Sequence, residues 1–459
     1  MAWLLPTGNQ INLQLGWPSA ELFPAAELNS SANEVLSSFD SAKAALIYGP
    51  NPGIPALRKQ VARWLSTVYF GSGASATSID PARICIAGGA SQNLSNILLR
   101  FTDPTYTRNI WMVEPTYFLA CPVFEDCGYA GKLRGVPEDD EGIDLHFLRA
   151  RLEQAEKEAA AVAAARGTED KPLLKVAGYE KIYKHVIYTV PTFSNPSGKT
   201  MSLHHREALV RLAIEFDALV VSDDVYDMLC WPADRTVKVT AGAIPIPPRL
   251  VDVNLRLDPE SKWGNTVSNG SFSKIIAPGA RVSWSESTPA FATFLANTGA
   301  TWSGGNPAQL TSNFVEKILA SGALEKHIKD TLIPTYATRY YTMVEAIHEY
   351  LEPLGVFIST GKPYLVDNEL EVAGGFFLCV SLPKEFPHTS ELAAKSIQEQ
   401  ELKFAHGRMF GVKGDAGSRE RAEGDGGYGS TLRLCWSFHN EDEIVEGIKR
   451  LRDVLVAVL

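Results

Sequence analysis

The chain has 459 residues, of which 45% are hydrophobic and 21% are charged, as in ordinary globular proteins. This length allows about three domain-sized units, which α/β enzymes often merge into one large and one smaller domain. The 43 basic and 53 acidic side chains give a formal net charge of −10, and no long basic run occurs. Neither a nucleic acid nor an anionic membrane is therefore an expected partner.

Neither disulfides nor membrane insertion is expected. The six cysteines are scattered without CxxC spacing, so buried reduced thiols are predicted, and no metal site is predicted. The N-terminus lacks a basic segment followed by a sustained apolar core, so it is unlike a signal peptide. No apolar run approaches the length of a membrane span. We therefore expect a cytoplasmic protein.

Residues 1–45 are expected to form an arm rather than a domain. A short extended run ends in a turn at Gly16-Trp17-Pro18. This turn either punctuates a loop or folds over a pocket, where Gly16 and Trp17 would contact a substrate. A lone tryptophan serves packing more often than ligand contact, so both interpretations stay open.

Strands and helices alternate along residues 46–320, which we predict to be the large domain. Alternation of this kind implies a mostly parallel sheet of about seven strands in an α/β fold. Apolar runs predict buried strands, and periodic apolar positions predict helices. The strands are predicted at residues 83–87, 110–113, 185–190 and 218–222, and the helices at residues 54–65, 93–101 and 203–215.

Polar residues follow several of these strands. Parallel sheets bind ligands outside the carboxyl ends of their strands. Asn195, Asp223, Tyr226 and Lys274 all fall at such positions. The glycine turn at residues 88–89 lies between a strand and a helix, where backbone N–H groups can point at a phosphate. These shared placements predict a ligand site at one edge of the sheet.

Residues 271–281 set one lysine, Lys274, among small hydroxyl residues and follow it with a Pro-Gly turn. A lysine that forms a Schiff base must be held away from bulk water and near an anion site. Ser271 and Ser273 can donate hydrogen bonds to phosphate oxygens, and Arg281 offers a two-pronged donor. The pattern suits pyridoxal phosphate (PLP) bound through Lys274. Taken alone, it also fits a solvated lysine beside an ordinary turn.

The C-terminal residues 321–459 are expected to form a smaller α+β domain. A long helical region, residues 309–351, is expected to break near Pro334. Residues 411–430 are polar and glycine-rich and are predicted to form a mobile loop. Arg433 lies inside an apolar strand, where it needs an anionic partner. That partner is either a substrate carboxylate or the acidic member of a structural salt bridge.

The spaced motifs together resemble fold-type I PLP-dependent enzymes of the class I/II aminotransferase family. The likeness is greatest to the branch with α-aminoadipate, kynurenine and aromatic aminotransferases, and it covers residues 11–455 in family order. The matching motifs are Tyr48-Gly49-Pro50, Gly89-Ala90-Ser91, Pro115-Thr116-Tyr117, Asn195-Pro196-Ser197-Gly198, Asp223-x-x-Tyr226, Ser271-x-Ser273-Lys274-x-x-x-Pro278-Gly279-x-Arg281 and Arg433-Leu434.

The resemblance implies a catalytic role for four matching residues. Lys274 is expected to bond covalently to PLP and to move the proton between the substrate Cα and C4′ of the cofactor. Asp223 is expected to pair with the pyridine nitrogen, which makes the ring an electron sink. Its spacing of three to Tyr226 favours it over Asp224. Asn195 and Tyr226 are expected to hydrogen-bond the 3-oxygen of the cofactor. Without the family, these residues could be a helix cap, a turn residue and a packed ring.

Other matches concern the ring face and the phosphate. Tyr117 is expected to stack on the pyridine ring. Tyr48 is expected to reach the phosphate of a neighbouring subunit, which implies a homodimer with shared active sites. The remaining phosphate ligands are expected to be the backbone N–H groups of Ala90 and Ser91 and the side chains of Ser271, Ser273 and Arg281.

The substrate is expected to be an L-amino acid whose α-carboxylate is clamped by Arg433, beside Asn195, Gly16 and Trp17. Trp17 stands where many relatives carry a small residue. The insertions at residues 150–180, 232–265 and 411–430 are longer than a compact relative needs. These departures leave the substrate class open.

The expected activity is amino transfer from an L-amino acid, aromatic or α-aminoadipate-like, to a 2-oxo acid. The alternative keeps PLP but changes the outcome to a lyase, decarboxylase or C–C bond-forming, cyclising reaction. A transcription regulator with an aminotransferase-like domain is disfavoured, because the enzyme-like pattern begins by Ile11 and leaves no room for a DNA-binding domain before it. A catalytically dead binding protein is disfavoured because Lys274 and Asp223 are both kept.

Overall fold

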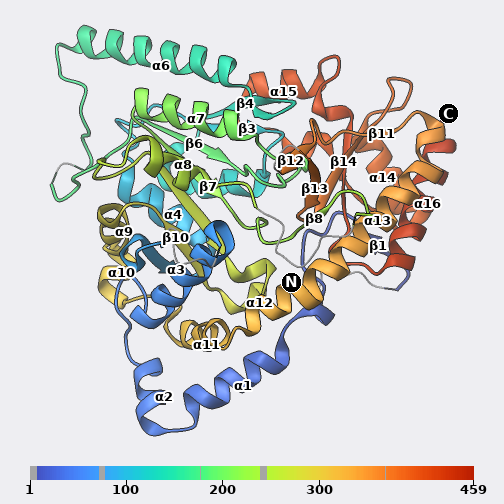
Figure 1. The fold of residues 1–459 in the computed structure, drawn as a ribbon. Helices are drawn as coiled ribbons and strands as arrows, with labels where there is room; N and C mark the ends of the chain where they lie inside the picture. The colour runs from blue at the N-terminus through green and yellow to red at the C-terminus, as the bar shows by residue number, and fades with distance from the viewer. Residues whose placement is uncertain (1–7, 72–77, 176, 238–245, 367–368) are drawn as a thin grey trace.

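An eight-stranded sheet lies at the centre of the computed structural model, which describes residues 8–71, 78–175, 177–237, 246–366 and 369–459 (Figure 1). Its core is parallel, from β9 through β7, β6 and β3 to β4; β10 runs antiparallel to both its neighbours, and β5 is a two-residue antiparallel extension. The order is β2 (Ile84–Ala87), β10 (Ser283–Glu286), β9 (Thr266–Ser271), β7 (Ala218–Asp223), β6 (His185–Thr189), β3 (Ile110–Glu114), β4 (Leu133–Asp139) and β5 (Gly142–Ile143).

Helices cover both faces of this sheet, because side chains alternate between the faces along each strand. Ile187 and Val220 pack with α6 (Leu145–Arg166), α7 (Leu203–Glu215) and α8 (Leu250–Leu257) in one core cluster. Their strand neighbours, among them Tyr188 and Val221, belong to the other cluster. That second cluster includes apolar residues of α3 (Pro55–Phe70), α4 (Ala90–Phe101), α5 (Cys121–Phe124) and α9 (Pro289–Ala296). The chain is thus α/β, as predicted.

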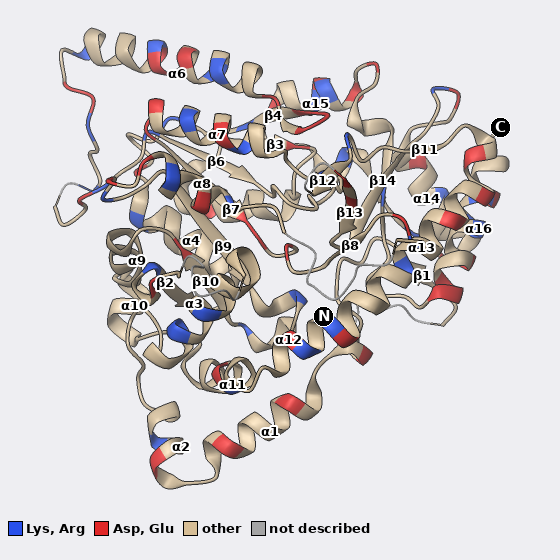
Figure 2. Cartoon of the chain, viewed as in Figure 1, with Lys and Arg blue, Asp and Glu red and all other residues tan. Residues whose placement is uncertain are grey.

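The long helix α6 projects along one edge of the molecule (Figure 1). It buries only Leu148, Leu152 and Ala155, and Figure 2 shows both acidic and basic residues along it. This helix is therefore largely solvated. No helix among the described residues has both the length and the apolarity needed to cross a membrane.

The helical region after the sheet breaks earlier than predicted. It consists of α11 (Gln309–Ala320), α12 (Ala323–His327) and α13 (Ile333–Tyr350), and α11 and α12 are separated at Ser321 and Gly322. Gly322 adopts a left-handed φ of 75°, which glycine tolerates without a side-chain clash. A π-helical segment (Ile328–Leu332) joins α12 to α13, and Pro334 follows it as the second residue of α13. The break therefore lies at Ser321 and Gly322, and near Pro334 the helix changes its hydrogen-bonding pattern without ending.

Two small sheets and three helices of 12 residues or more lie in the described C-terminal part. The four-stranded sheet has the order β11 (Phe357–Ile358), β14 (Phe377–Ser381), β17 (Thr431–Cys435) and β16 (Ala405–His406). The three-stranded sheet joins β12 (Tyr364–Val366) and β13 (Leu370–Gly374) to β8 (Cys230–Pro232). The helices are α13, α14 (Thr389–Gln400) and α16 (Glu441–Val456).

The N-terminal arm is attached to this C-terminal part. Its strand β1 (Ile11–Asn12) pairs in parallel with β15 (Leu402–Lys403). The arm continues into α1 (Ala25–Leu36), which packs on α11, and α2 (Phe39–Leu46), which lies at the lower edge in Figure 1. Residues 13–18, which follow β1, therefore lie across the end of the large sheet.

The polar stretch at residues 411–430 is folded, contrary to the predicted mobile loop. It contains α15 (Ala416–Glu423), whose Arg421 pairs with the buried carboxylate of Glu114 and donates to the Gly135 carbonyl at 3.1 Å. Asp415 accepts a hydrogen bond from the Gly135 N–H at 2.8 Å. Composition predicted disorder because the stretch is poor in apolar residues. It is fixed instead by an ion pair with β3 and by hydrogen bonds with the backbone of β4.

Candidate active site

Lys274 lies in a short turn immediately after β9, at the predicted carboxyl edge of the sheet. Its Nζ donates a hydrogen bond to the Gly16 carbonyl at 2.9 Å. Burial lowers the pKa of Lys274 to about 8, against the opposing influence of Cys435 and Asp223. An amine with this pKa is partly neutral near neutral pH and can act as a nucleophile.

Asp223 ends the neighbouring strand β7. Its Oδ2 accepts a hydrogen bond from the Tyr188 hydroxyl at 2.7 Å. Its Oδ1 is shielded from solvent and has no hydrogen-bond partner in the part of the chain that the structure describes. Burial raises the pKa of Asp223 to about 6, while the Tyr188 hydrogen bond opposes that rise. A shielded carboxylate oxygen without a donor fits a protonated ring nitrogen.

The start of α4 forms a cradle for an anion. Gly89 precedes the helix with φ 109°, and a Cβ at this position would lie 1.9 Å from Nη2 of Arg281. The missing side chain thus lets the guanidinium approach the helix N-terminus. Ser271 and Ser273 lie at the end of β9, where the Ser271 hydroxyl donates to Ser273 Oγ at 3.0 Å. Backbone N–H groups, hydroxyls and a guanidinium together fit a phosphate.

Arg433 reaches the site from β17 of the C-terminal sheet. Its Nη1 donates to Asn195 Oδ1 at 2.8 Å, and its Nη2 donates to the Gln14 carbonyl at 2.5 Å. Its guanidinium carbon lies 4.2 Å from the ring centroid of Phe377 and 5.1 Å from that of Phe410. Arg433 is only 6% exposed, and no acidic side chain among the described residues forms an ion pair with it. A buried arginine without a carboxylate partner fits the carboxylate of a ligand.

Tyr226 and Tyr117 lie beside these groups. The buried Tyr226 ring packs between Phe376 and Phe377, and its centroid is 6.0 Å from Lys274 Nζ. Tyr117 is half-buried in the turn after β3, and burial together with Asp223 raises its pKa to about 12. Both phenols therefore stay protonated near neutral pH and can donate hydrogen bonds.

Tyr48 and Trp17 make no side-chain hydrogen bond with the described residues around Lys274, and Gly16 meets Lys274 through its backbone carbonyl. Tyr48 is 86% exposed at the end of α2, and none of the side-chain hydrogen bonds between described residues involves it. Trp17 is half-buried, and its carbonyl accepts a hydrogen bond from Ser437 Oγ at 2.7 Å. Gly16 packs so closely against the Phe377 ring that a Cβ would lie 2.5 Å from it.

Sequence analysis missed Tyr188 and Phe410. Tyr188 was assigned only to a buried strand, although its alternation with Ile187 already placed it on the face of the sheet opposite α6 and α7. Phe410 lay at the edge of a segment predicted to be a loop. Its ring packs edge-on against Phe118 at 5.8 Å, and its carbonyl accepts from the Thr116 N–H at 2.8 Å.

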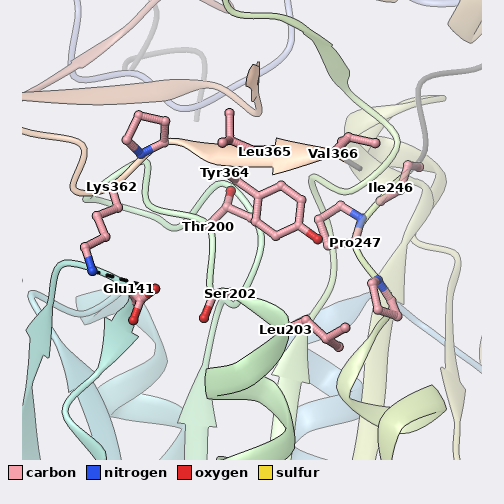
Figure 3. Close-up of a pocket in the computed structure, with 12 residues that line it drawn as sticks. Glu141, Thr200, Ser202, Leu203, Ile246, Pro247, Lys362, Tyr364, Leu365 and Val366 are labelled. Atoms are coloured by element: carbon pink, nitrogen blue, oxygen red, sulfur yellow. Dashed lines mark ion pairs between the residues drawn. The ribbon is translucent and has the colours of Figure 1, made fainter. Parts of the chain in front are cut away.

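A hollow of about 490 Å³ lies elsewhere, between the start of α7 and β12 (Figure 3). Proline and aliphatic residues line one side, and Lys362 forms an ion pair with Glu141 at 3.9 Å on the other. None of the predicted site residues lines this hollow. The candidate active site is therefore the cluster around Lys274.

Comparison with known proteins gives the same assignment. The sequence profile of the family "Aminotransferase class I and II" matches residues 9–451. An uncharacterized protein of Saccharomyces cerevisiae is 34% identical over 96% of this chain and 95% of its own length. Aromatic-amino-acid aminotransferase 1 of Thermococcus litoralis is 27% identical over 98% of this chain and 89% of its own length.

The structure is also similar to a solved kynurenine aminotransferase of Pyrococcus horikoshii, crystallised in complex with PMP. The two superpose with a TM-score of 0.72 at 26% sequence identity, over 99% of this chain and 92% of the relative. The fold and the lysine site define a fold-type I PLP-dependent enzyme. The chain belongs to the aminotransferase class I and II family. It is a PLP-dependent transferase, and the lyase, decarboxylase and cyclase alternatives are not favoured.

Proposed function

We propose that the protein transfers the amino group of an L-amino acid to a 2-oxo acid by means of PLP held at Lys274. One observation carries this proposal. A lysine of lowered pKa, a carboxylate oxygen without a donor and a buried arginine without a carboxylate converge on one end of the sheet. Each of these groups lacks what the cofactor or an amino acid provides. When bound, PLP supplies an electron sink for the negative charge that develops at the substrate Cα.

The residues of the chain would divide the work around that electron sink. Lys274 would attach the cofactor and then carry the proton to and from the substrate Cα. Asp223 would hold the ring nitrogen protonated, while Asn195 and Tyr226 would donate hydrogen bonds to the 3-oxygen. The cradle of Ala90, Ser91, Ser271, Ser273 and Arg281 would hold the phosphate, and Tyr117 would cover the ring face.

The amino-acid substrate would be aromatic or α-aminoadipate-like. Arg433 would bind its α-carboxylate, and the side chain would extend among Tyr117, Trp17 and Phe410. This proposal is supported by the aromatic surroundings of Arg433. It is also supported by the names of relatives, which include the aromatic-amino-acid and kynurenine aminotransferases and a 2-aminoadipate transaminase of Thermus thermophilus.

Absorption spectroscopy tests the proposed function. An effective L-amino acid is expected to remove the visible band of the PLP-loaded protein and to produce the shorter-wavelength band of PMP, because the amino group stays on the cofactor. A 2-oxo acid is expected to reverse the change. Ammonia release without accumulation of PMP would contradict amino transfer, and the absence of any PLP band would contradict the whole proposal.

Replacing Arg433 is expected to weaken substrate binding while leaving cofactor binding unchanged. Arg433→Lys removes the two-pronged donor, and a hydrogen bond to a charged group is worth about 1.5–3 kcal/mol, so KM should rise roughly 10- to 100-fold. Steady-state kinetics with an active amino acid measures this. The matched control is Arg206→Lys, which alters another fully buried arginine, bonded to the carbonyls of Met201 and Pro191. Equal changes in both variants would place the carboxylate site elsewhere.

We propose that two copies of the chain form a homodimer with shared active sites. Large apolar side chains are exposed around α2 and at α10 (Gly299–Gly304), next to Tyr48. These residues are Phe39 (80% exposed), Leu46 (64%), Ile47 (56%), Tyr48 (86%) and Trp302 (68%). Large apolar side chains exposed in this number are typical of an interface between subunits. Tyr48 would reach the phosphate of the partner's cofactor, and residues 46–320 and 321–459 would be the large and small domains of each copy.

Sedimentation equilibrium tests the homodimer. The unmodified protein is expected to sediment as a dimer and Phe39→Asp as a monomer, because the substitution places a charge in the apolar surface. Asp40→Asn, which alters the neighbouring exposed position, serves as the control and should remain dimeric. A monomeric unmodified protein would contradict the shared active site.

A further inference from the structure

The two carboxylate oxygens of Asp223 have different surroundings. Oδ2 accepts a hydrogen bond from the Tyr188 hydroxyl at 2.7 Å. Oδ1 is shielded from solvent and without a donor among the described residues. Tyr188 is itself only 2% exposed, and its hydroxyl makes no other hydrogen bond in the described part of the chain. The hydroxyl of Tyr188 thus lies in a buried region where its one partner is Asp223.

The parallel pairing of β6 and β7 brings these two residues together. Tyr188 stands opposite Val221 in the register, and Asp223 lies two residues further along the same face. Long aromatic side chains reach such diagonal neighbours. The Tyr188 ring is also fixed by Phe124, which packs edge-on with ring centroids 5.7 Å apart. The hydroxyl is therefore placed by the sheet and by α5 rather than by a loop.

We propose that Tyr188 is a positioning residue that keeps Asp223 ionised and leaves Oδ1 facing the pyridine nitrogen of PLP. This inference rests on the proposed function. It adds a residue that neither the motif pattern nor the family comparison assigned. A carboxylate with both oxygens free could rotate or take up a proton, whereas one fixed at Oδ2 presents a single oxygen to the cofactor.

The charged and titratable groups around Asp223 act in opposite directions. Burial raises its pKa, and Asp227, on the turn after β7, adds to the rise. Tyr188 from β6 and the Lys274 ammonium lower the pKa. Tyr117 and Tyr226 also face this carboxylate, and the charge on Asp223 raises the pKa of both phenols. When Lys274 is bonded to PLP, Tyr188 is the remaining one of these two groups that lowers the pKa of Asp223.

Tyr188 can fulfil this role without exchanging its proton. Burial and the adjacent Asp223 raise the pKa of Tyr188 well above its ordinary value, so its hydroxyl remains a donor throughout the working pH range. The hydrogen bond is made to the charged form of Asp223 and stabilises that form. Removing the hydroxyl should therefore raise the pKa of Asp223.

The direction of the effect on PLP binding follows from this shift. Ionised Asp223 attracts the protonated ring nitrogen, so the affinity for PLP should fall as the pH drops through the Asp223 pKa. In Tyr188→Phe this decline should begin at higher pH. A displacement of one pKa unit corresponds to about a tenfold loss of affinity on the acid side.

PLP titration of the cofactor-free protein, followed by its visible absorbance at several pH values, measures the effect. We expect Tyr188→Phe to bind PLP about tenfold more weakly at pH values below the Asp223 pKa, with the acid limb of the curve displaced upward by about one pH unit. The matched control is Tyr183→Phe, which removes an equally buried hydroxyl that donates to the Gly264 carbonyl rather than to Asp223. Tyr183→Phe should lower the free energy of unfolding without moving the pH dependence of PLP affinity.

Two further measurements separate positioning from a purely structural role. Deazapyridoxal 5′-phosphate, whose ring carries C–H in place of the nitrogen, should bind Tyr188→Phe and the unmodified protein equally well. Incorporation of 3-fluorotyrosine at position 188 keeps the side-chain shape but makes the hydroxyl a stronger donor, so the acid limb should move to lower pH. This variant gives the answer if Tyr188→Phe does not fold.

The outcomes distinguish the inference from the function on which it rests. If PLP affinity has the same pH dependence with tyrosine, phenylalanine and 3-fluorotyrosine at position 188, Tyr188 is only a packing residue and the inference is wrong. An equal loss of affinity for PLP and for its deaza analogue would also overturn it. If the unmodified protein binds no PLP at all, the proposed function itself fails.

Discussion

Lys274→Ala is expected to abolish the covalent attachment of PLP and nearly all amino transfer. The substitution removes the amine that forms the bond and also the group that moves the proton at the substrate Cα. General acid–base catalysis by a positioned side chain contributes roughly 10²- to 10⁴-fold, so turnover should fall by at least that factor. The site should still bind PLP non-covalently, because Asp223, Arg281 and the start of α4 are unchanged.

Borohydride reduction followed by mass measurement tests this result. The unmodified protein should retain one PLP per chain after reduction, and Lys274→Ala should retain none. Lys132→Ala is the control, because Lys132 is half-buried as well but is bonded to the carbonyls of Pro104 and Thr107 outside the site. A reducible adduct that persists in Lys274→Ala would assign the attachment to another lysine.

Asp223→Asn is expected to cause the second large loss of activity. The amide keeps the shape of the side chain but removes the negative charge opposite the ring nitrogen, so the ring becomes a weaker electron sink. Loss of one preorganised electrostatic contact in an active site costs about 10²- to 10³-fold in kcat. Turnover under saturating substrate and excess PLP measures this effect apart from cofactor affinity.

The adjacent carboxylate provides the control for Asp223. Asp224 is 6% exposed and accepts hydrogen bonds from Ser222 and Ser268. Burial and the nearby Asp227 raise the pKa of Asp224 to about 8, so this group is largely neutral at neutral pH. Asp224→Asn should therefore change kcat little. A severe loss in Asp224→Asn with near-normal activity in Asp223→Asn would exchange the two assignments.

The sequence predicted the α/β alternation well because each element carries its own local pattern. Strand β6 and helix α7 fall within a residue of their predicted bounds, since apolar runs and helical spacing are local signals. The break near Pro334 was misplaced because a π-helical segment at residues 328–332 carries the helix past this proline, whereas the helix is interrupted at Ser321 and Gly322. The segment with α15 was misjudged because its stability comes from Glu114, which lies far away in the sequence.

The site was predicted where a motif carries the chemistry and missed where only tertiary structure does. Lys274 stood out among small hydroxyl residues, Asp223 at the end of a buried strand and Arg433 inside an apolar strand. The fold brings all three to one end of the sheet. Tyr188 gave no such signal, because a tyrosine in a buried strand is ordinary packing until its neighbour across the register is known. The reach of Tyr48 to a second chain stays a prediction, since it depends on a partner subunit.

The pairing of β1 with β15 places the N-terminal arm in contact with both Arg433 and Lys274. Leu13 accepts a hydrogen bond from the Cys435 N–H at 2.9 Å, so the arm is joined directly to the strand that bears Arg433. Gln14 and Gly16 are separated by one residue. The Gln14 carbonyl accepts a hydrogen bond from Arg433, and the Gly16 carbonyl accepts one from Lys274. The guanidinium of Arg433 and the ammonium of Lys274 are therefore both hydrogen-bonded to the same short peptide. A carboxylate that binds Arg433 and displaces this peptide would therefore also change the hydrogen bond between Gly16 and Lys274.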